Sequence, residues 1–385
     1  LAISTLVSVL PRGPASLSRH SLQVVRPTSI SNPFVLTGSD HEVQGRATMD
    51  PLTQGLMGAA LPQVANRDRR LLFWAGCFGF LAGMAPDLDV FIRSSSDPLL
   101  YLEYHRQFTH ALVFIPVGGL LCAAVFHLLL GRRSGLSFKQ TWLICTLGYG
   151  THGLLDAFTS YGTLLLWPFS SDRVALNAVS VIDPLFTVPV LVLLILAVVC
   201  RRRGFAVAAL LWAGLYLGAG LLQRQAALGM GEALAASRGH TLLRLDAKPS
   251  FGNLLVWKVI YETDDRYFVD AVRPTLAPRV FEGESVLKLD IARDFPDLDP
   301  ASQQRRDIER FREFSNGYLA QDPLRPDRIV DMRYSMVPNE IEGLWSIEIL
   351  ATAGPDTHAS FQNHRGDSRA GFDRLWSLIT APTVD

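Results

Sequence analysis

The chain has 385 residues, with 36 basic and 36 acidic side chains, so its formal net charge is zero and a nucleic-acid partner is not indicated. Its charge is unevenly distributed, because 43 of the 72 charged residues follow Ser237, after a series of apolar runs. The four cysteines lie within these runs without metal-ligand spacing, which predicts small core side chains rather than disulfides.

Residues 1–48 are rich in Ser, Pro and Arg and show no sustained periodicity, so we expect a disordered or non-native N-terminal extension. Its apolar start lacks the preceding basic region of an export signal. From Met49 onward a short helix is predicted to residue 65, with Asp50 as its N-cap and Pro51 at its first helical position.

Apolar runs of membrane-spanning length follow this short helix. About 20 helical residues at 1.5 Å per residue cross a hydrocarbon core of about 30 Å. The predicted spans cover residues 71–92, 110–130, 142–166, 182–200 and 205–222. The third is interrupted by His152 and Asp156.

Basic residues between the spans predict the orientation through the positive-inside rule. They lie before the first span, between the second and third, and between the fourth and fifth: Arg67, Arg69, Arg70, Arg132, Arg133, Lys139, Arg201, Arg202 and Arg203. These connections are therefore predicted to be cytoplasmic, with the C-terminal region outside. The seven acidic residues between 71 and 222 all fall on the outer side of this topology.

Residues 237–385 are predicted to form a soluble, extracytoplasmic α+β domain with an antiparallel sheet. Its strands are expected at residues 241–245, 254–261, 267–272, 286–289, 328–336 and 344–349. An amphipathic helix is expected at 301–320, and the tail after residue 353 is expected to be irregular apart from a short helix at 372–378. The predicted fold is therefore an all-α polytopic membrane bundle at 49–225, with about five spanning helices plus the short N-terminal helix, followed by this domain.

An acidic turn ends the first span, where Asp87 and Asp89 follow Pro86. In a turn both carboxylates can point at one cation. Alternatively, they mark the end of the helix and face water.

A second polar group precedes the next span. His105 and His110 are five residues apart and cannot share one helix face, so we expect His105 in the loop and His110 in the first turn of the span. Arg106 could hold an anionic group or pair with an acid. A purely structural role at the membrane interface is the alternative for the histidines.

His152 and Asp156 lie inside the third span at i,i+4 spacing, which puts both on one helix face. Ionisable groups are rare inside spans and are usually functional, although a His–Asp hydrogen bond that stabilises the bundle is the alternative. Weaker candidates share this level: Thr53 and Gln54, the segment 160–163 one turn beyond Asp156, and Asp183, which is also an ordinary N-cap.

Together these residues predict a metal site in the outer half of the membrane. Mixed His and Asp ligands suit Zn²⁺, Mn²⁺ or Fe²⁺, and zinc is the first choice. The candidate ligands are Asp87, Asp89, His105, His110, His152 and Asp156. Six ligands exceed one tetrahedral site, so either two metals bind or some carboxylates support the ligands. The cation would activate a water molecule, with Asp89 or Asp156 as general base and Arg106 binding an anionic group.

The same motifs carry a family resemblance. Met-Asp-Pro-Leu-Thr-Gln-Gly, Pro-Asp-Leu-Asp, His-Arg-x-x-Thr-His and His-x-x-x-Asp, in this order among spans, resemble the bacterial inner-membrane predicted metal-dependent hydrolases, some of them LexA-regulated. The resemblance covers roughly residues 49–200 and implies that the six candidate ligands are the functional residues. Family members often have His at the position of Gln54, so Gln54 is doubtful as a ligand.

The leading hypothesis is a membrane-bound metal-dependent hydrolase that acts on a lipid or cell-envelope phosphoester at the outer face of the inner membrane. The bilayer is then its principal partner, and the sequence gives no signal for an oligomeric state. One alternative is a transporter that uses the His/Asp layer for ion relay. Another is an envelope scaffold in which that layer only fixes helix packing.

Overall fold

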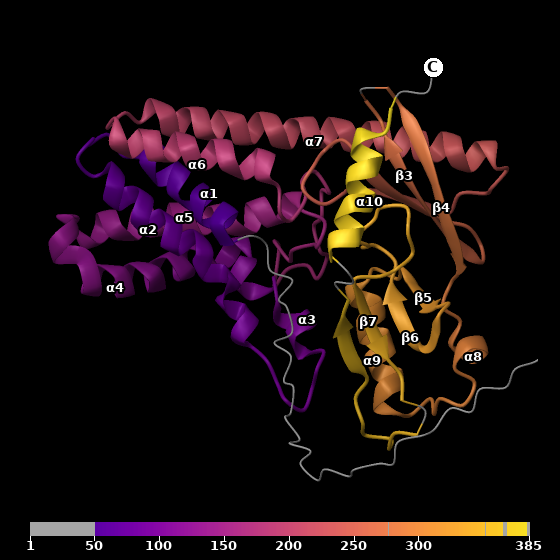
Figure 1. Ribbon diagram of the computed structural model, residues 1–385. Helices are drawn as coiled ribbons and strands as arrows, with labels where there is room; N and C mark the ends of the chain where they lie inside the picture. The colour runs from indigo at the N-terminus through magenta and orange to yellow at the C-terminus, as the bar shows by residue number, and fades with distance from the viewer. Residues whose placement is uncertain (1–50, 276, 351, 365–367, 383–385) are drawn as a thin grey trace, which may run out of the picture. The chain divides into compact units, whose positions relative to one another are not determined.

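The computed structural model describes residues 51–275, 277–350, 352–364 and 368–382, and the expectation for residues 1–48 lies outside them. Helices form the first part of the chain and β-sheets dominate the second (Figure 1). The long helices are α1 (Pro51–Ala65), α2 (Leu72–Met84), α4 (Ile115–Ser134), α5 (Phe138–Phe158), α6 (Pro184–Val199) and α7 (Gly204–Ser237). Between α2 and α4 lie shorter segments: η1 (Ala85–Phe91), α3 (Leu100–Tyr104), η2 (Phe108–His110) and η3 (Leu112–Phe114).

Within the described part of the chain, two helical segments are long and apolar enough to cross a membrane, Leu112–Ser134 and Gly204–Ser237. Among the described residues the other helices are shorter or more polar, since α2 has 13 residues and α6 has 16. The predicted count of five spans is therefore not confirmed. The first predicted span is shortened because Pro86 cannot continue the α-helical hydrogen bonding, and a 3₁₀ segment replaces the last turns.

Glycines let α1, α2 and α5 pack closely. A Cβ added at Gly148 of α5 would lie 2.5 Å from the carbonyl oxygen of Gly79 in α2, and one at Gly58 of α1 would lie equally close to that oxygen. Backbones can approach to such distances only where side chains are absent. The close approach brings the C-terminal ends of α2 and α5, which carry the polar motifs, to one place.

The three connections that carry the basic residues, α1–α2, α4–α5 and α6–α7, lie together at one end of the helix bundle, on the left in Figure 1. The C-terminal ends of α2 and α5 lie at the opposite end of the bundle. Basic connections and acidic motifs are thus separated along the helix axes.

The second part of the chain contains two four-stranded antiparallel sheets, with orders β1-β2-β3-β4 and β5-β6-β7-β8. The strands are β1 (Arg244–Pro249), β2 (Trp257–Glu262), β3 (Arg266–Arg273), β4 (Arg279–Leu287), β5 (Leu319–Asp322), β6 (Arg325–Asp331), β7 (Trp345–Glu348) and β8 (Ser360–Asn363). The helices are α8 (Ile291–Asp294), α9 (Gln303–Phe314) and α10 (Ser368–Thr380). The predicted antiparallel pairing is confirmed.

Two helix ends were predicted wrongly, and one strand was missed. Helix α7 continues to Ser237 instead of ending near residue 222, because its second half packs on β1 and β2, where Gly231 contacts Val259. Helix α9 ends at Phe314 instead of residue 320, since Asn316 and Gly317 adopt positive φ angles of 52° and 77°. The missed strand is β5, which begins at Leu319 inside the range of the predicted helix.

Two further strands differ from the sequence-based expectation. Strand β8 lies in the tail that was expected to be irregular, and β4 begins at Arg279, well before the predicted residue 286. Much of β4 is exposed, so its side chains do not show the apolar alternation that identifies a half-buried strand.

Candidate metal centre

The polar motifs come together where the end of α2, the loop before α4 and the end of α5 meet. Pro86 ends α2, and the following 3₁₀ segment η1 carries Asp87 and the buried Asp89. Ser137 begins α5 with a capping box to Gln140, and the helix places His152 and Asp156 in its last two turns. The prediction that Asp87 and Asp89 follow the end of a helix is confirmed. Helix α5 ends at Phe158 instead of residue 166, so His152 and Asp156 lie near its end rather than inside a longer span.

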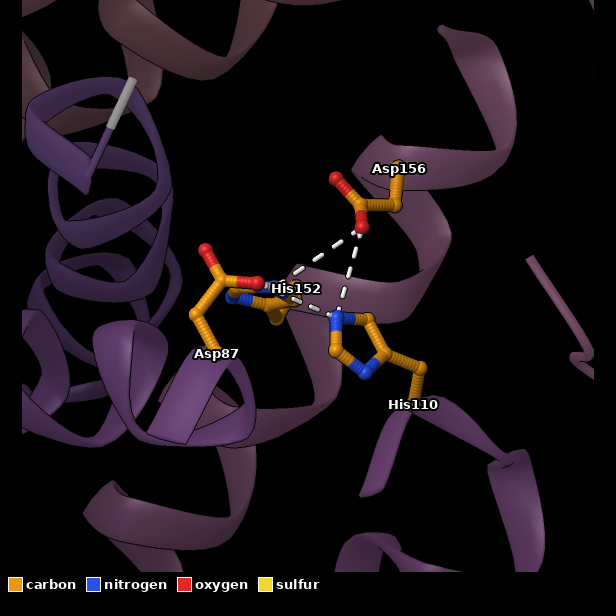
Figure 2. A group of neighbouring side chains, drawn as sticks. All are labelled: Asp87, His110, His152 and Asp156. Carbon is orange, nitrogen blue, oxygen red and sulfur yellow. Dashed lines mark ion pairs between the residues drawn. The ribbon is translucent and has the colours of Figure 1, made fainter. Parts of the chain in front are cut away.

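Four side chains point at one another in the centre of this region: Asp87 from η1, His110 from η2, and His152 and Asp156 from α5 (Figure 2). The Nε2 atom of His110 lies 3.4 Å from Asp87 Oδ1 and 3.4 Å from Asp156 Oδ2. The Nε2 atom of His152 lies 3.4 Å from Asp87 Oδ1 and 3.9 Å from Asp156 Oδ2. We call these four residues the tetrad.

The tetrad has the spacing of a tetrahedral metal site. Four donor atoms bound at about 2.0–2.1 Å lie about 3.3–3.4 Å from one another. The four facing atoms are also buried and have no hydrogen-bond partner among the described residues: Asp87 Oδ1, His110 Nε2, His152 Nε2 and Asp156 Oδ2. Asp156 Oδ2 also forms an ion pair with Arg106, whereas the other three atoms face only the members of the tetrad. Buried polar atoms are normally hydrogen-bonded, so a shared cation accounts for this arrangement.

The balance of charge in this region also favours a bound cation. Asp87, Asp89 and Asp156 contribute three carboxylates to this region, and the guanidinium of Arg106 pairs with one of them, Asp156. With neutral histidines, two negative charges remain at sites of little or no solvent exposure. Unpaired buried charge is costly, and a divalent cation would balance it.

Each histidine of the tetrad is held by its second nitrogen. His152 Nδ1 lies 2.5 Å from the carbonyl oxygen of Gly83, which can only accept, so Nδ1 donates and Nε2 is free to bind a cation. His110 Nδ1 lies 2.9 Å from Thr109 Oγ1 and 3.3 Å from Asp89 Oδ2. Such outer contacts fix the tautomer and ring orientation of metal-binding histidines.

Asp89 supports the tetrad from behind His110. Its Oδ1 lies 2.8 Å from His105 Nδ1, and its Oδ2 accepts hydrogen bonds from the Arg106 backbone N–H at 3.0 Å and Thr109 Oγ1 at 2.8 Å. These contacts occupy both carboxylate oxygens. The geometry therefore favours a positioning role for Asp89 over the predicted role as general base.

His105 is fully buried beside Asp89. Burial lowers the pKa of His105, although the hydrogen bond with Asp89 opposes this shift, so the ring is neutral near pH 7. Asp87, Asp89 and His105 form a second group with ligand atoms within 4.8 Å of one another. The two alternatives drawn from the sequence, a second metal or a supporting shell, therefore both stay open for His105.

Arg106 is fully buried next to the tetrad and joins it to the neighbouring loops. Its Nε lies 3.0 Å from Asp156 Oδ2, its Nη1 donates to Thr159 Oγ1, and its guanidinium lies 4.6 Å from the ring centre of Tyr161. The residue has a φ of 63°, in the left-handed region, and its backbone N–H bond to Asp89 holds this conformation. The predicted pairing of Arg106 with an acid is confirmed.

The weaker candidates divide into two kinds. Gln54 Nε2 donates to Asp156 Oδ1 at 2.6 Å, so this buried residue orients a member of the tetrad. Thr53 instead pairs with Thr187 at 2.6 Å. Asp183 accepts from the backbone of Leu185 and is the N-cap of α6, as its ordinary interpretation predicted.

Sequence reasoning missed Thr109, Thr159 and the carbonyl of Gly83 as supports of the site. Thr109 lies within the His-Arg-x-x-Thr-His motif, which was the available signal. The Gly83 carbonyl carries no side-chain signal, and Thr159 becomes a partner only through the position of Arg106.

The fold and the tetrad define a class: a membrane protein with a buried His/Asp cluster at the ends of its helices, followed by a domain with β-sheets. Residues 49–227 match the family model described as YdjM inner membrane protein. This match supports a bacterial inner-membrane location.

Two curated proteins are similar to parts of the chain. The uncharacterized protein YfhP of Bacillus subtilis (strain 168) is 30% identical over 142 residues, which cover 35% of this chain and 42% of that protein. The inner membrane protein YbcI of Escherichia coli (strain K12) is 38% identical over 109 residues, 27% of this chain and 57% of that protein. The chain thus spans about half the length of these relatives. No solved structure matches it.

The names of the family and of YbcI agree with the inner-membrane part of the family resemblance. They say nothing of a metal or of hydrolysis, so these parts of the resemblance stay predictions.

Proposed function

We propose that the protein is a membrane-bound, metal-dependent hydrolase whose tetrad of Asp87, His110, His152 and Asp156 binds one divalent cation, with zinc as the first choice. The observation that carries this proposal is the convergence of four buried donor atoms, spaced 3.4–3.9 Å apart across the measured pairs, none of them hydrogen-bonded among the described residues. A site of that composition suits Zn²⁺, with Mn²⁺ and Fe²⁺ as alternatives.

When bound, such a cation acts as a Lewis acid and makes water a stronger nucleophile. The chain itself supplies a place for the proton. Asp87 Oδ2 is buried and has no hydrogen-bond partner among the described residues, whereas Asp89 and Asp156 have contacts at both oxygens. Asp87 Oδ2 is therefore the best placed carboxylate oxygen to accept a proton, in preference to the predicted Asp89 or Asp156.

Arg106 gives the site its preference for an anionic substrate. Its guanidinium contacts Asp156 through Nε, and its Nη2 has no hydrogen-bond partner among the described residues. A phosphoester oxygen is a suitable acceptor for such a group. A lipid or cell-envelope phosphoester is accordingly the proposed substrate class.

The proposed topology places this chemistry at the outer face of the inner membrane. The three connections rich in Arg and Lys share one end of the helix bundle, and the tetrad lies toward the other (Figure 1). In this arrangement five helices cross the bilayer, some of them shorter than a typical span, and residues 237–385 are extracytoplasmic. Cysteine labelling from outside intact cells at position 324, whose Leu is 91% exposed, tests the orientation. Labelling only after lysis would contradict it.

Elemental analysis of the purified full-length protein, combined with an assay on a phosphomonoester amphiphile, tests the function. We expect about one metal ion per chain and hydrolysis that a chelator abolishes and the metal restores. The Asp87→Asn and His152→Ala variants should lose both the metal and the activity.

Matched controls separate the site from general damage. His127→Ala removes a partly buried histidine that contacts Thr141 in the bundle, away from the tetrad, and Asp172→Asn changes an exposed carboxylate. Both should keep wild-type metal content and activity. Metal content equal to wild type in Asp87→Asn and His152→Ala would refute the proposed centre.

A further inference from the structure

A cavity of about 380 Å³ lies beside the tetrad, between the loop after α5 and the sheet domain. Its helical side includes Arg106, Ser160 and Tyr161, and its other side includes residues of β1, β2 and the segment 333–345. The Tyr334 hydroxyl donates to the Ser160 carbonyl oxygen and joins the two sides. The volume is typical of a site for a small ligand.

Four cationic side chains line this cavity, and all are buried: Arg106, Lys248, Lys258 and Arg333. Three of them have a carboxylate partner, since Arg106 pairs with Asp156 at 3.0 Å, Lys248 with Asp246 at 2.9 Å and Arg333 with Asp331 at 2.7 Å. These three are electrically balanced.

Lys258 differs from the other three. Its Nζ donates to Ser335 Oγ at 2.8 Å and to the Glu340 carbonyl oxygen at 3.0 Å, and among the described residues it forms no ion pair. A buried ammonium without an anion is costly and is seldom found without a reason. The cavity therefore has, on its sheet side, one buried amine without a carboxylate partner among the described residues, and an anionic ligand would stabilise its charged form.

Arg106 supplies a second open donor, on the helical side. Its Nη2 has no hydrogen-bond partner among the described residues, and because the side chain has no solvent exposure, water does not replace that partner. One ligand that accepts hydrogen bonds from both Arg106 and Lys258 would satisfy both groups. Two cationic donors suit a doubly charged phosphomonoester better than a carboxylate.

The remaining walls are largely apolar, with Val181, Ile182, Phe251, Met336 and Trp345 among them. Ile182 and Phe251 are 40% and 42% exposed, so the apolar wall continues to the surface of the protein. Ile182 lies two residues before the start of the apolar helix α6. A hydrocarbon chain that left the cavity past these residues would therefore run toward the membrane.

We propose that this cavity binds a phosphomonoester amphiphile, with its phosphate between Arg106 and Lys258 and its hydrocarbon chain along Ile182 and Phe251. That this ligand is a substrate rests on the proposed hydrolase function. Binding itself needs no metal. Arg106 connects the two sites, because it touches Asp156 of the tetrad and lines the cavity.

Native mass spectrometry of the full-length, metal-free protein in a neutral detergent tests the proposal with 1-oleoyl-lysophosphatidic acid as probe. We expect a one-to-one complex, and at least about tenfold weaker binding in Lys258→Met, because a hydrogen bond to a charged group is lost. Lys288→Met is the matched control. That lysine lies on the same domain, pairs with Glu262 and does not line the cavity, so its binding should equal wild type.

Two further ligands separate the sources of the phosphate. Inorganic phosphate lacks the chain and lysophosphatidylcholine carries a neutralised headgroup, so each should bind at least about tenfold more weakly than the lysophosphatidic acid. Equal binding of inorganic phosphate would overturn the amphiphile. Equal binding of lysophosphatidylcholine would overturn the role of the two cations.

The metal serves as an independent check on folding. Lys258→Met should retain wild-type zinc binding, so that weakened lipid binding reports on the cavity. Should Lys258→Met fail to fold, Phe251→Ser at the exposed rim must weaken the lysophosphatidic acid and leave zinc binding unchanged. Unaltered lysophosphatidic acid binding in a folded Lys258→Met or Phe251→Ser variant would refute the lipid site but not the hydrolase. A wild-type protein that binds the lipid but no zinc would refute the metal-dependent hydrolase but not the lipid site.

Discussion

The helical region and the sheet domain both bury carboxylates, but they balance them differently. In the sheet domain Asp331 receives three hydrogen bonds from the guanidinium of Arg333, and Asp270 is held at both oxygens by Arg238. In the helical region Asp87 faces two histidines, and Arg106 balances only one of three carboxylates. The carboxylate charges of the sheet domain are thus neutralised by arginine side chains, whereas those of the helical region are neutralised only when a cation binds.

The largest expected effect is a difference in stability between variants of the two regions. Asp331→Ala leaves Arg333 buried without a partner, and we expect a loss of about 3–5 kcal/mol in the free energy of unfolding. Asp87→Asn should leave the metal-free protein equally stable or more stable, because it removes one of three crowded negative charges. Denaturant unfolding of both variants, followed by circular dichroism, measures the difference. A comparable loss in both variants would contradict the distinction between the regions.

The next effect concerns the support of the metal ligands. Asp89→Asn keeps the shape of the side chain but removes the charge that holds His105, Thr109 and His110. We expect zinc affinity to fall by about 10–100-fold while about one ion per chain still binds at saturation. Competition titration against a chromophoric chelator measures the affinity. A complete loss of binding would instead make Asp89 a direct ligand.

Helix packing should matter more at the glycines near the tetrad than at those on the outer surface. A methyl group at Gly148 would meet the carbonyl of Gly79, so Gly148→Ala should cost about 1–3 kcal/mol. Gly214→Ala in α7 meets nothing within 4 Å and should be neutral or slightly stabilising. Thermal unfolding of the two variants in the same detergent compares them. Equal melting temperatures would show that the close approach of α2 and α5 is not needed.

The last prediction concerns the pH dependence of the sheet domain. Burial lowers the pKa of Lys258 to about 7, although Asp331, Glu340 and Glu284 oppose the shift. Above this value the unfolded chain binds a proton that the folded chain lacks, so stability should rise with pH from about 7 toward the ordinary lysine value. The slope is at most about 1.4 kcal/mol per pH unit.

Lys258→Met removes this titration. Its unfolding free energy, measured from pH 6.5 to 9.5, should lack the rise that Lys258 contributes, and below pH 7 it should be at least as stable as wild type. The control Lys288→Met should keep the wild-type slope. An unchanged slope in Lys258→Met would assign the pH dependence to another group.

The sequence was most informative where polar residues interrupt apolar runs. His152 and Asp156 could be placed on one face because helical spacing requires it, and the structure confirms their proximity at 3.9 Å. The convergence of Asp87 and His110 with this pair was inferred only from shared depth in the membrane, since their contact depends on how α2 and α5 pack. The support given by Gln54 and Thr159 depends on the same packing.

The sheet domain was less predictable. Strands β2, β3 and β7 have many buried residues and were expected, whereas the exposed β4 and the short β8 have no comparable pattern. The second half of α7 was missed because its small residues, such as Ala227 and Gly231, face the sheet without forming an apolar run. Long-range pairing fixes these elements, and local sequence carries little of that information.

X-ray absorption at the zinc edge of the purified full-length protein tests the tetrad as a metal centre. We expect about one zinc ion bound only by nitrogen and oxygen at about 2.0–2.1 Å, with outer-shell scattering from two imidazole rings. His152→Ala should remove the zinc signal, in line with the loss of metal expected for this variant. A spectrum dominated by sulfur, or one without imidazole scattering, would contradict the assignment of the tetrad as the metal centre.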